Sequence, residues 1–376
     1  MVPGYFDHNA TTPLCPQAKA AWLTAQDNLW LNPSSPYRAS AEVHAHLESA
    51  REQMARFFET APARVIFNSG ATEGNHALFA HWASTLPKNR FVGVGSTEHP
   101  SVLAAADYYF GDRLKQLPVD ANGAVEKSQI DFESFAAVSV MAANNETGVL
   151  NPWREIAVAA KGAGVFFHCD ASQWIGKLPL KGLSVCDFVT GCAHKFGGPR
   201  GVGFLLVPES GVNFRSFAGG AQEDGRRGGT EDVPGILGML AALKAISEAE
   251  PGQAEGRNRF EAAVEDFCQV ISKGGERLWN TSLLLLPEFA SERWVRALEK
   301  RGFLVSTGAA CATGKATRSH ALTAMGMEAD CLRRVLRVSS GRETLSAEWL
   351  ELASALRIVY KGLQSDRPDS TTVIHT

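Results

Sequence analysis

The sequence has no run of about 18 consecutive apolar residues, the length that indicates a membrane-spanning helix. Its first residues, MVPGYFDHNATTP, lack the charged and apolar regions of a secretory signal peptide. Neither charge is in excess, because 37 Lys and Arg residues stand against 40 Asp and Glu residues, a net charge of −3. These absences predict a cytoplasmic protein that binds neither membranes nor nucleic acid.

Cysteine is also sparse. The chain has seven cysteines, an odd number, and no two of them form a Cys-x-x-Cys pair. We therefore expect no disulfide framework and no structural zinc site, and we predict no metal site elsewhere. This cysteine usage is typical of a reducing compartment and agrees with a cytoplasmic location.

The first two thirds of the chain predict an α/β fold with a mostly parallel sheet. Of its 376 residues, 45% are hydrophobic, which is enough for one large domain and a smaller one. Short apolar runs alternate with helical patterns such as 72–84 and 153–164, as in parallel α/β sheets. The last two runs are joined by a Gly/Pro-rich loop without a helix, which predicts a local antiparallel pair. The expected strands are 64–68, 90–95, 138–144, 165–170, 187–191 and 202–207.

A second, smaller α+β domain is expected after the boundary at 250–257. The pattern there predicts helices at 258–272, 291–300 and 346–360 and strands at 279–287 and 335–341. We place the large domain at 13–250 and the small domain at 1–12 and 251–363. Residues 364–376 form a polar tail.

Asp170 and Lys195 follow successive predicted strands in the stretches HCDASQ and CAHKFGGPRG. In a parallel sheet, strand ends of one polarity gather at one edge, where ligands bind. An acid and a lysine there form either an ordinary ion pair or a pyridoxal phosphate site. In the second case the lysine forms a Schiff base and the acid contacts the pyridinium nitrogen.

Three further stretches follow predicted strands. NSGATEGN, around Ala71 and Thr72, is either a helix start capped by Ser69 or Thr72 or a phosphate site at a helix N-terminus. His99 in TEHPSV is either structural or stacks on a flat aromatic cofactor. Asn145 in NNETG either belongs to a turn or donates to a phenolate oxygen.

Two more polar residues stand out in the second half of the chain. Thr230, at an expected helix start in GGAQEDGRRGGTED, could bind a phosphate, even that of a neighbouring subunit, although such a loop is by default flexible surface. Arg337 in LRVSSGR offers a planar guanidinium for a substrate carboxylate, or is a surface arginine.

Cys311 lies in STGAACATGK, where small residues and two glycines surround a thiol. An inert thiol is usually buried in an apolar element, and no nearby Cys or His forms a metal-ligand pair with Cys311. The small flanking residues favour a mobile, exposed loop, the environment that a reactive thiol needs.

Taken together, these motifs resemble the cysteine desulfurases of the NifS/IscS-like branch, within the class-V aminotransferase family of fold-type I pyridoxal phosphate enzymes. The resemblance runs from YFDHNATTP to LRVSSGRETL, nearly the whole chain. It implies an α/β fold-type I transferase with helices on both faces of a mostly parallel sheet in the large domain, and a smaller C-terminal α+β domain.

The resemblance also implies a role for each motif. Lys195 would bond to pyridoxal 5'-phosphate, and Arg337 and Asn145 would bind L-cysteine. His99 would stack on the cofactor ring and relay protons. Thr230 would reach the phosphate in the partner subunit of a homodimer. The other cofactor contacts would come from Asp170, Gln173, Ala71, Thr72, Asn145, Cys192 and His194.

Cys311 falls on the family's nucleophile, in a loop similar to that of the long-loop branch. The resemblance implies that sulfur from L-cysteine forms a persulfide on Cys311, that L-alanine leaves, and that an acceptor protein takes the sulfur for iron–sulfur cluster assembly or thiolation. The alternatives are selenocysteine lysis or transamination on the same scaffold, and a sulfur-carrier or scaffold protein without turnover.

The sequence departs from the family pattern at three places. Cys192 replaces a serine that usually binds the phosphate, and a thiol is a weak donor. The stretch NPSSPYRAS lacks the usual histidine, and KATRSHALTAMG lacks the usual Leu-Glu-Pro, which bears on the dimer or acceptor surface.

Overall fold

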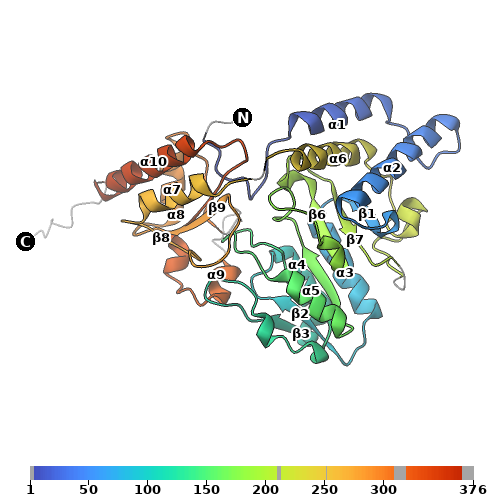
Figure 1. The fold of residues 1–376 in the computed structure, drawn as a ribbon, viewed down its shortest axis with the longest axis horizontal. Coiled ribbons are helices and arrows are strands. Elements are labelled where there is room, and N and C mark those ends of the chain that lie inside the picture. Colours follow the sequence, from blue (N-terminus) through green and yellow to red (C-terminus); the bar gives the residue numbers. More distant parts are fainter. Residues whose placement is uncertain (1–3, 210–212, 251, 309–318, 366–376) are drawn as a thin grey trace, which may run out of the picture.

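The chain folds around two β-sheets of unequal size in a computed structural model that describes residues 4–209, 213–250, 252–308 and 319–365. The larger sheet has the strand order β1-β7-β6-β5-β4-β2-β3 and belongs to the α/β domain (Figure 1). Strand β7 runs antiparallel to β1 and β6, as predicted for the last pair, and the other pairs are parallel. Its strands are β1 (Val65–Asn68), β2 (Phe91–Gly95), β3 (Leu114–Leu117), β4 (Phe135–Ser139), β5 (Phe166–Asp170), β6 (Phe188–Cys192) and β7 (Gly203–Leu206).

Helices cover both faces of this sheet because its strands alternate side chains between two apolar layers. Phe67 and Val189 belong to the layer that packs under α2, α5 and α6, whereas Ile66 and Phe188 belong to the layer under α3 and α4. The helices of this domain are α1 (Pro16–Asn28), α2 (Arg38–Phe57), α3 (Ala71–Thr85), α4 (Pro100–Phe110), α5 (Trp153–Gly162) and α6 (Val233–Ser247).

The smaller α+β domain is built on an antiparallel sheet of order β10-β9-β8, at the left of Figure 1. Phe260, Trp294 and Trp349 bring three helices against Leu284 and Leu336 of the sheet. Its elements are α7 (Glu255–Val264), β8 (Gln269–Val270), β9 (Thr281–Leu285), α8 (Ser291–Glu299), α9 (His320–Ala324), β10 (Val335–Ser339) and α10 (Ser346–Ser365).

The N-terminal segment joins the two domains. Tyr5 bridges to Leu304 and Asp7 to Ser339, both in the smaller domain. A few residues later, the Thr12 N–H donates to the carbonyl of His194 in the larger domain. Residues 7–12 therefore cross between the domains beside the predicted site.

The predicted fold class is confirmed, with three local errors. The expected helix 258–272 is wrong beyond Val264, where the chain turns and forms β8. The strand expected at 138–144 ends at Ser139 and begins earlier, at Phe135. Strand β3 was not predicted, because its two central side chains are polar and exposed at the edge of the sheet. The domain boundaries at 13, 251 and 364 stay predictions.

Candidate active site

A pocket of about 400 Å³ lies at the carboxyl edge of the larger sheet. The loops that follow β1, β2, β4, β5 and β6 all line it, as expected for a parallel sheet. The structure thus gathers nine of the predicted site residues in one place: Ala71, Thr72, His99, Asn145, Asp170, Gln173, Cys192, His194 and Lys195.

Asp170, the last residue of β5, is buried and accepts two hydrogen bonds. The Asn75 side-chain amide donates to its Oδ2 at 3.0 Å, and the Ser172 backbone N–H donates to its Oδ1 at 2.9 Å. These two bonds fix the orientation of the Asp170 carboxyl group at the wall of the pocket.

Behind Asp170, a buried chain of hydrogen bonds that the sequence did not reveal crosses the sheet. The Thr190 hydroxyl donates to Asn75 Oδ1 at 2.8 Å, and His168 Nε2 lies 3.1 Å from that hydroxyl. Burial lowers the pKa of His168 to about 4, so its ring is neutral. The Thr190 hydroxyl donates its proton to Asn75, so it can only accept from His168 Nε2. The neutral ring therefore carries its proton on Nε2, and its Nδ1 accepts from the Ser139 hydroxyl. This chain orients Asn75 toward Asp170.

Lys195 ends a 3-10 turn, Ala193–Lys195, directly after β6. Its Nζ donates to the backbone carbonyls of Asn9 at 2.6 Å and Ala10 at 2.8 Å, both in the N-terminal segment. Burial lowers the pKa of Lys195, and the charge of Arg337 lowers it further, while Asp170 and Asp7 oppose the shift. The amine is therefore easier to deprotonate than an exposed lysine.

His99 caps α4, and its ring belongs to the pocket wall. Its Nδ1 accepts from the Ser101 backbone N–H at 3.2 Å, so the neutral ring carries its proton on Nε2. The pKa of His99 is lowered mainly by burial. His194 is similar: burial, with the nearby Lys195 charge, lowers its pKa to about 4. Both rings are neutral at pH 7.

The start of α3 forms an anion cradle. Gly70 precedes the helix with a φ of 147°, in the region that favours glycine, and no side chain caps the helix, so the predicted capping by Ser69 or Thr72 is wrong. The first N–H groups of a helix attract anions when they are not capped. The Ala71 N–H faces the sulfur of Cys192, whose pKa is raised by burial, so the cradle holds a neutral thiol. Together with Lys195 and Asp170, this cradle fits pyridoxal phosphate, because it offers an amine, an acid and an anion site in one pocket.

Arg337 is buried, with 1% of its surface exposed, so the surface interpretation is wrong. Its Nη2 pairs with Asp7 Oδ1 at 2.7 Å, and its Nη1 donates to the carbonyl of Asn145 at 2.9 Å. Its Nε is buried and has no partner among the described residues. The sequence did not reveal Asp7 as its partner, because 330 residues separate the two.

Thr230 is exposed and does not line the pocket of its own chain. Helix α6 begins three residues later, and Asp232, not Thr230, caps it by accepting from the Gly235 N–H. The loop before it is held by two ion pairs: Arg51 and Glu223 form a buried pair at 2.7 Å, and Arg227 and Glu73 form a partly exposed pair at 2.9 Å. Cys311 lies outside the described residues.

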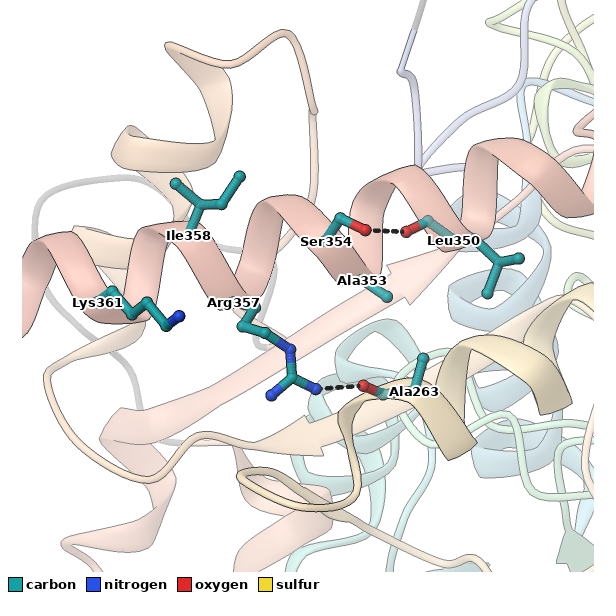
Figure 2. A pocket seen from close by; sticks show the side chains of 7 residues that line it. All are labelled: Ala263, Leu350, Ala353, Ser354, Arg357, Ile358 and Lys361. Carbon is teal, nitrogen blue, oxygen red and sulfur yellow. Dashed lines mark hydrogen bonds between the residues drawn. The ribbon is translucent and has the colours of Figure 1, made fainter.

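A second hollow, between α7 and α10 of the smaller domain, does not resemble an active site (Figure 2). Arg357 and Lys361 are the only charged side chains among the seven residues that line its volume of about 400 Å³. Arg357 donates to the carbonyl of Ala263, as Figure 2 shows. Within the described ranges, no three His, Cys, Asp or Glu side chains are grouped to hold a metal ion, and no helix is long and apolar enough to cross a membrane.

Comparisons with known proteins agree with this geometry. Residues 4–348 match the family described as aminotransferase class-V. A cysteine desulfurase of Klebsiella pneumoniae is 36% identical over 92% of this chain and 89% of its own length, and cysteine desulfurase 2 of Trichormus variabilis is 33% identical over 97% and 95%. A solved NifS-like protein has a TM-score of 0.85 and 28% identity, covering 97% of this chain and 100% of its own.

Proposed function

Because this chain belongs to the class-V aminotransferase family, we propose that it removes sulfur from L-cysteine, releases L-alanine and holds the sulfur on Cys311 as a persulfide. It is a pyridoxal-phosphate-dependent cysteine desulfurase, a sulfur-transferring enzyme, like the relatives that cover more than nine tenths of it. The observation that carries this function is the meeting of Lys195, Asp170 and the uncapped start of α3 in one pocket.

We assign the cofactor contacts as follows. The first-turn N–H groups at Ala71 and Thr72 hold the phosphate, and the Asp170 side chain holds the ring nitrogen. His99 packs on the ring, and Lys195 is the covalent attachment point. Gln173, Asn145, Cys192 and His194 complete the wall. When bound, pyridoxal phosphate supplies an electron sink for negative charge on the substrate α-carbon.

We assign substrate binding, proton transfer and sulfur transfer to separate residues of the chain. Arg337 binds the substrate carboxylate, aided by Asn145. Lys195 Nζ, with its lowered pKa, accepts the α-proton of the substrate. The thiolate of Cys311 forms an S–S bond to the substrate sulfur while the C–S bond breaks. The carbon that loses sulfur takes up a proton, and the product is alanine. His99 holds a proton on Nε2 for such a transfer.

We further propose that the enzyme is a homodimer in which Thr230 contacts the phosphate in the partner subunit. Thr230 is exposed on a loop whose base is fixed by the buried Arg51–Glu223 pair, so it can reach outward from an ordered support. The persulfide of Cys311 would pass to an acceptor protein of iron–sulfur cluster assembly or thiolation. A cytoplasmic location fits this chemistry, because the six described cysteines are all free thiols.

The test is a turnover assay that measures alanine and sulfide from L-cysteine in the presence of a reductant. Wild type should form both products in equal amounts, and Cys311→Ser should keep its cofactor but form neither. Cys331→Ser is the matched control, because Cys331 is a partly exposed thiol of the same domain, and it should keep full activity. Full activity in Cys311→Ser would overturn the assignment of Cys311 as the nucleophile. A wild-type protein that carries its cofactor but forms no product would overturn the proposed desulfurase function.

A further inference from the structure

A second buried lysine lies beside the site. Lys177 is 6% exposed, and its Nζ donates to Gln173 Oε1 at 2.8 Å. The charged groups that act on it include three cations, Lys195, Arg337 and Arg342. Burying a lysine among cations costs stability. The proposed chemistry does not use this lysine, so its position needs another explanation.

The backbone of Lys177 is fixed at both ends. Its N–H donates to the carbonyl of Trp174 at 3.0 Å, and its carbonyl accepts from Trp279 Nε1 at 3.1 Å. Lys177 lines a cavity of about 610 Å³, and Gln173 lines the pocket of about 400 Å³; Lys195 lines both. Gln173 therefore lies between Lys177 and the cofactor pocket.

The donor at Lys177 decides how the Gln173 amide is turned. A charged lysine amine can only donate, and a neutral one still has N–H groups to donate, so in both states the oxygen of the amide faces Lys177. The amide nitrogen then points the other way, and it donates to the Asn9 carbonyl at 2.9 Å. Lys195 Nζ donates to the same carbonyl at 2.6 Å. Lys177 thus orients Gln173 Nε2 toward the atoms that surround Lys195.

We propose that Lys177 is a positioning residue that holds the Gln173 amide with its N–H₂ group toward the phenolic oxygen of the cofactor. This inference rests on the proposed function, in which Gln173 contacts that oxygen. With Lys177 in place, only one of the two amide orientations satisfies both neighbours. Without it, Gln173 Oε1 loses its donor and the Asn9 carbonyl is left to fix the amide, so the N–H₂ group is held less firmly toward the cofactor.

The test is a double-mutant cycle on the cofactor-loaded protein, read from the visible absorbance of bound pyridoxal phosphate as a function of pH. A donor to the phenolic oxygen stabilises negative charge on it. Its loss in Lys177→Met should move the midpoint of the colour change to higher pH by about half to one unit, the worth of one hydrogen bond. Gln173→Ala should cause at least this shift, and adding Lys177→Met to Gln173→Ala should cause no more.

Lys177→Arg is the rescue variant, because it keeps a donor and the adjoining cavity of about 610 Å³ offers room for the longer side chain. The midpoint pH of Lys177→Arg should differ from that of wild type by no more than about a fifth of the shift seen in Lys177→Met. Additive shifts in the double mutant, or an unshifted Lys177→Met that still binds cofactor, would overturn the inference. A wild type that binds no pyridoxal phosphate would instead overturn the proposed function.

Discussion

Arg337 Nη2 lies 2.7 Å from Asp7 Oδ1, so the residue proposed to bind the substrate carboxylate already holds a carboxylate of its own chain. A bound cysteine would share the guanidinium with Asp7 or use Nε of Arg337, which has no partner in the part of the chain that the structure describes. Asp7 also lies close enough to Lys195 to act on its pKa. The Asp7–Arg337 pair therefore bears both on substrate binding at Arg337 and on the pKa of Lys195.

We predict that Asp7→Asn lowers the KM for L-cysteine about three- to fivefold and leaves kcat within about twofold, because it removes a competing negative charge whose pairing with Arg337 is worth roughly 1 kcal/mol or less. Steady-state kinetics with cysteine measure this. Arg337→Lys is the opposing control and should raise the KM, because the planar fork is lost. A raised KM in Asp7→Asn would contradict the substrate role of Arg337.

Lys195→Ala should abolish the covalent attachment of pyridoxal phosphate. After reduction with borohydride and unfolding, wild type should retain the cofactor on the chain and the variant should release it. Lys177→Met controls for the loss of a neighbouring buried lysine and should still retain the cofactor. Retention in Lys195→Ala would show that another amine forms the bond.

Cys192→Ser should strengthen the binding of pyridoxal phosphate about two- to tenfold, because a hydroxyl is a better donor than a thiol in the cradle beside Ala71. Equilibrium binding to cofactor-free protein gives the Kd. Pyridoxal, which lacks the phosphate, is the matched ligand, and its Kd should not change. Equal changes for both ligands would place the effect at the ring instead.

The contribution of Lys177 to the stability of the protein should rise between pH 7 and pH 10. Its folded-state pKa is lowered by burial from 10.5 to about 7, so the unfolded chain binds more protons in this window. Each such group contributes a slope of about 1.4 kcal/mol per pH unit, favouring the folded state as pH rises. Urea unfolding with saturating cofactor should show a smaller slope in Lys177→Met. An identical slope would mean that Lys177 stays charged in the folded protein.

Glu223→Ala should destabilise the protein by about 3 kcal/mol, because it leaves the buried Arg51 with only the partly exposed Glu48 as an ionic partner. It also removes the acceptor of the Phe67 N–H, which lies 3.0 Å from Glu223 Oε2. Glu52→Ala is the control, since Glu52 is exposed and 3.9 Å from Arg56, and it should cost less than about 1 kcal/mol. Thermal or urea unfolding distinguishes the two. Similar losses of stability in both variants would argue against a stabilising role of the buried Arg51–Glu223 pair in the loop that carries Thr230.

The sequence predicted best the central strands of the larger sheet, in which the side chains on both faces are buried. The strands that end at Asp170 and Cys192 are buried along almost their whole length and begin with apolar residues, and each was placed within a residue or two. Edge strand β3 was missed because only its terminal leucines carry the apolar signal. The end of the helix at Val264 was also missed, because no glycine or proline marks the turn into β8.

The pocket residues could be predicted because each follows a strand, and the topology gathers strand ends. Their partners could not, since Asp7, Asn9 and Asn75 act through contacts that span between 95 and 330 residues of sequence. Thr230 shows a further limit: its surroundings in one chain say nothing of a contact made by the partner subunit. Cys311 remains a sequence prediction, outside the described residues.

The segment from Asp7 to Thr12 has one more consequence. Asp7 is tied to β10, Asn9 donates to Thr281 Oγ1 of β9, and the carbonyls of Asn9 and Ala10 hold the amine of Lys195. The same short stretch of backbone is thus tied to both sheets, so the position of the acceptors that hold Lys195 depends on the contacts of Asp7 and Asn9 with β10 and β9.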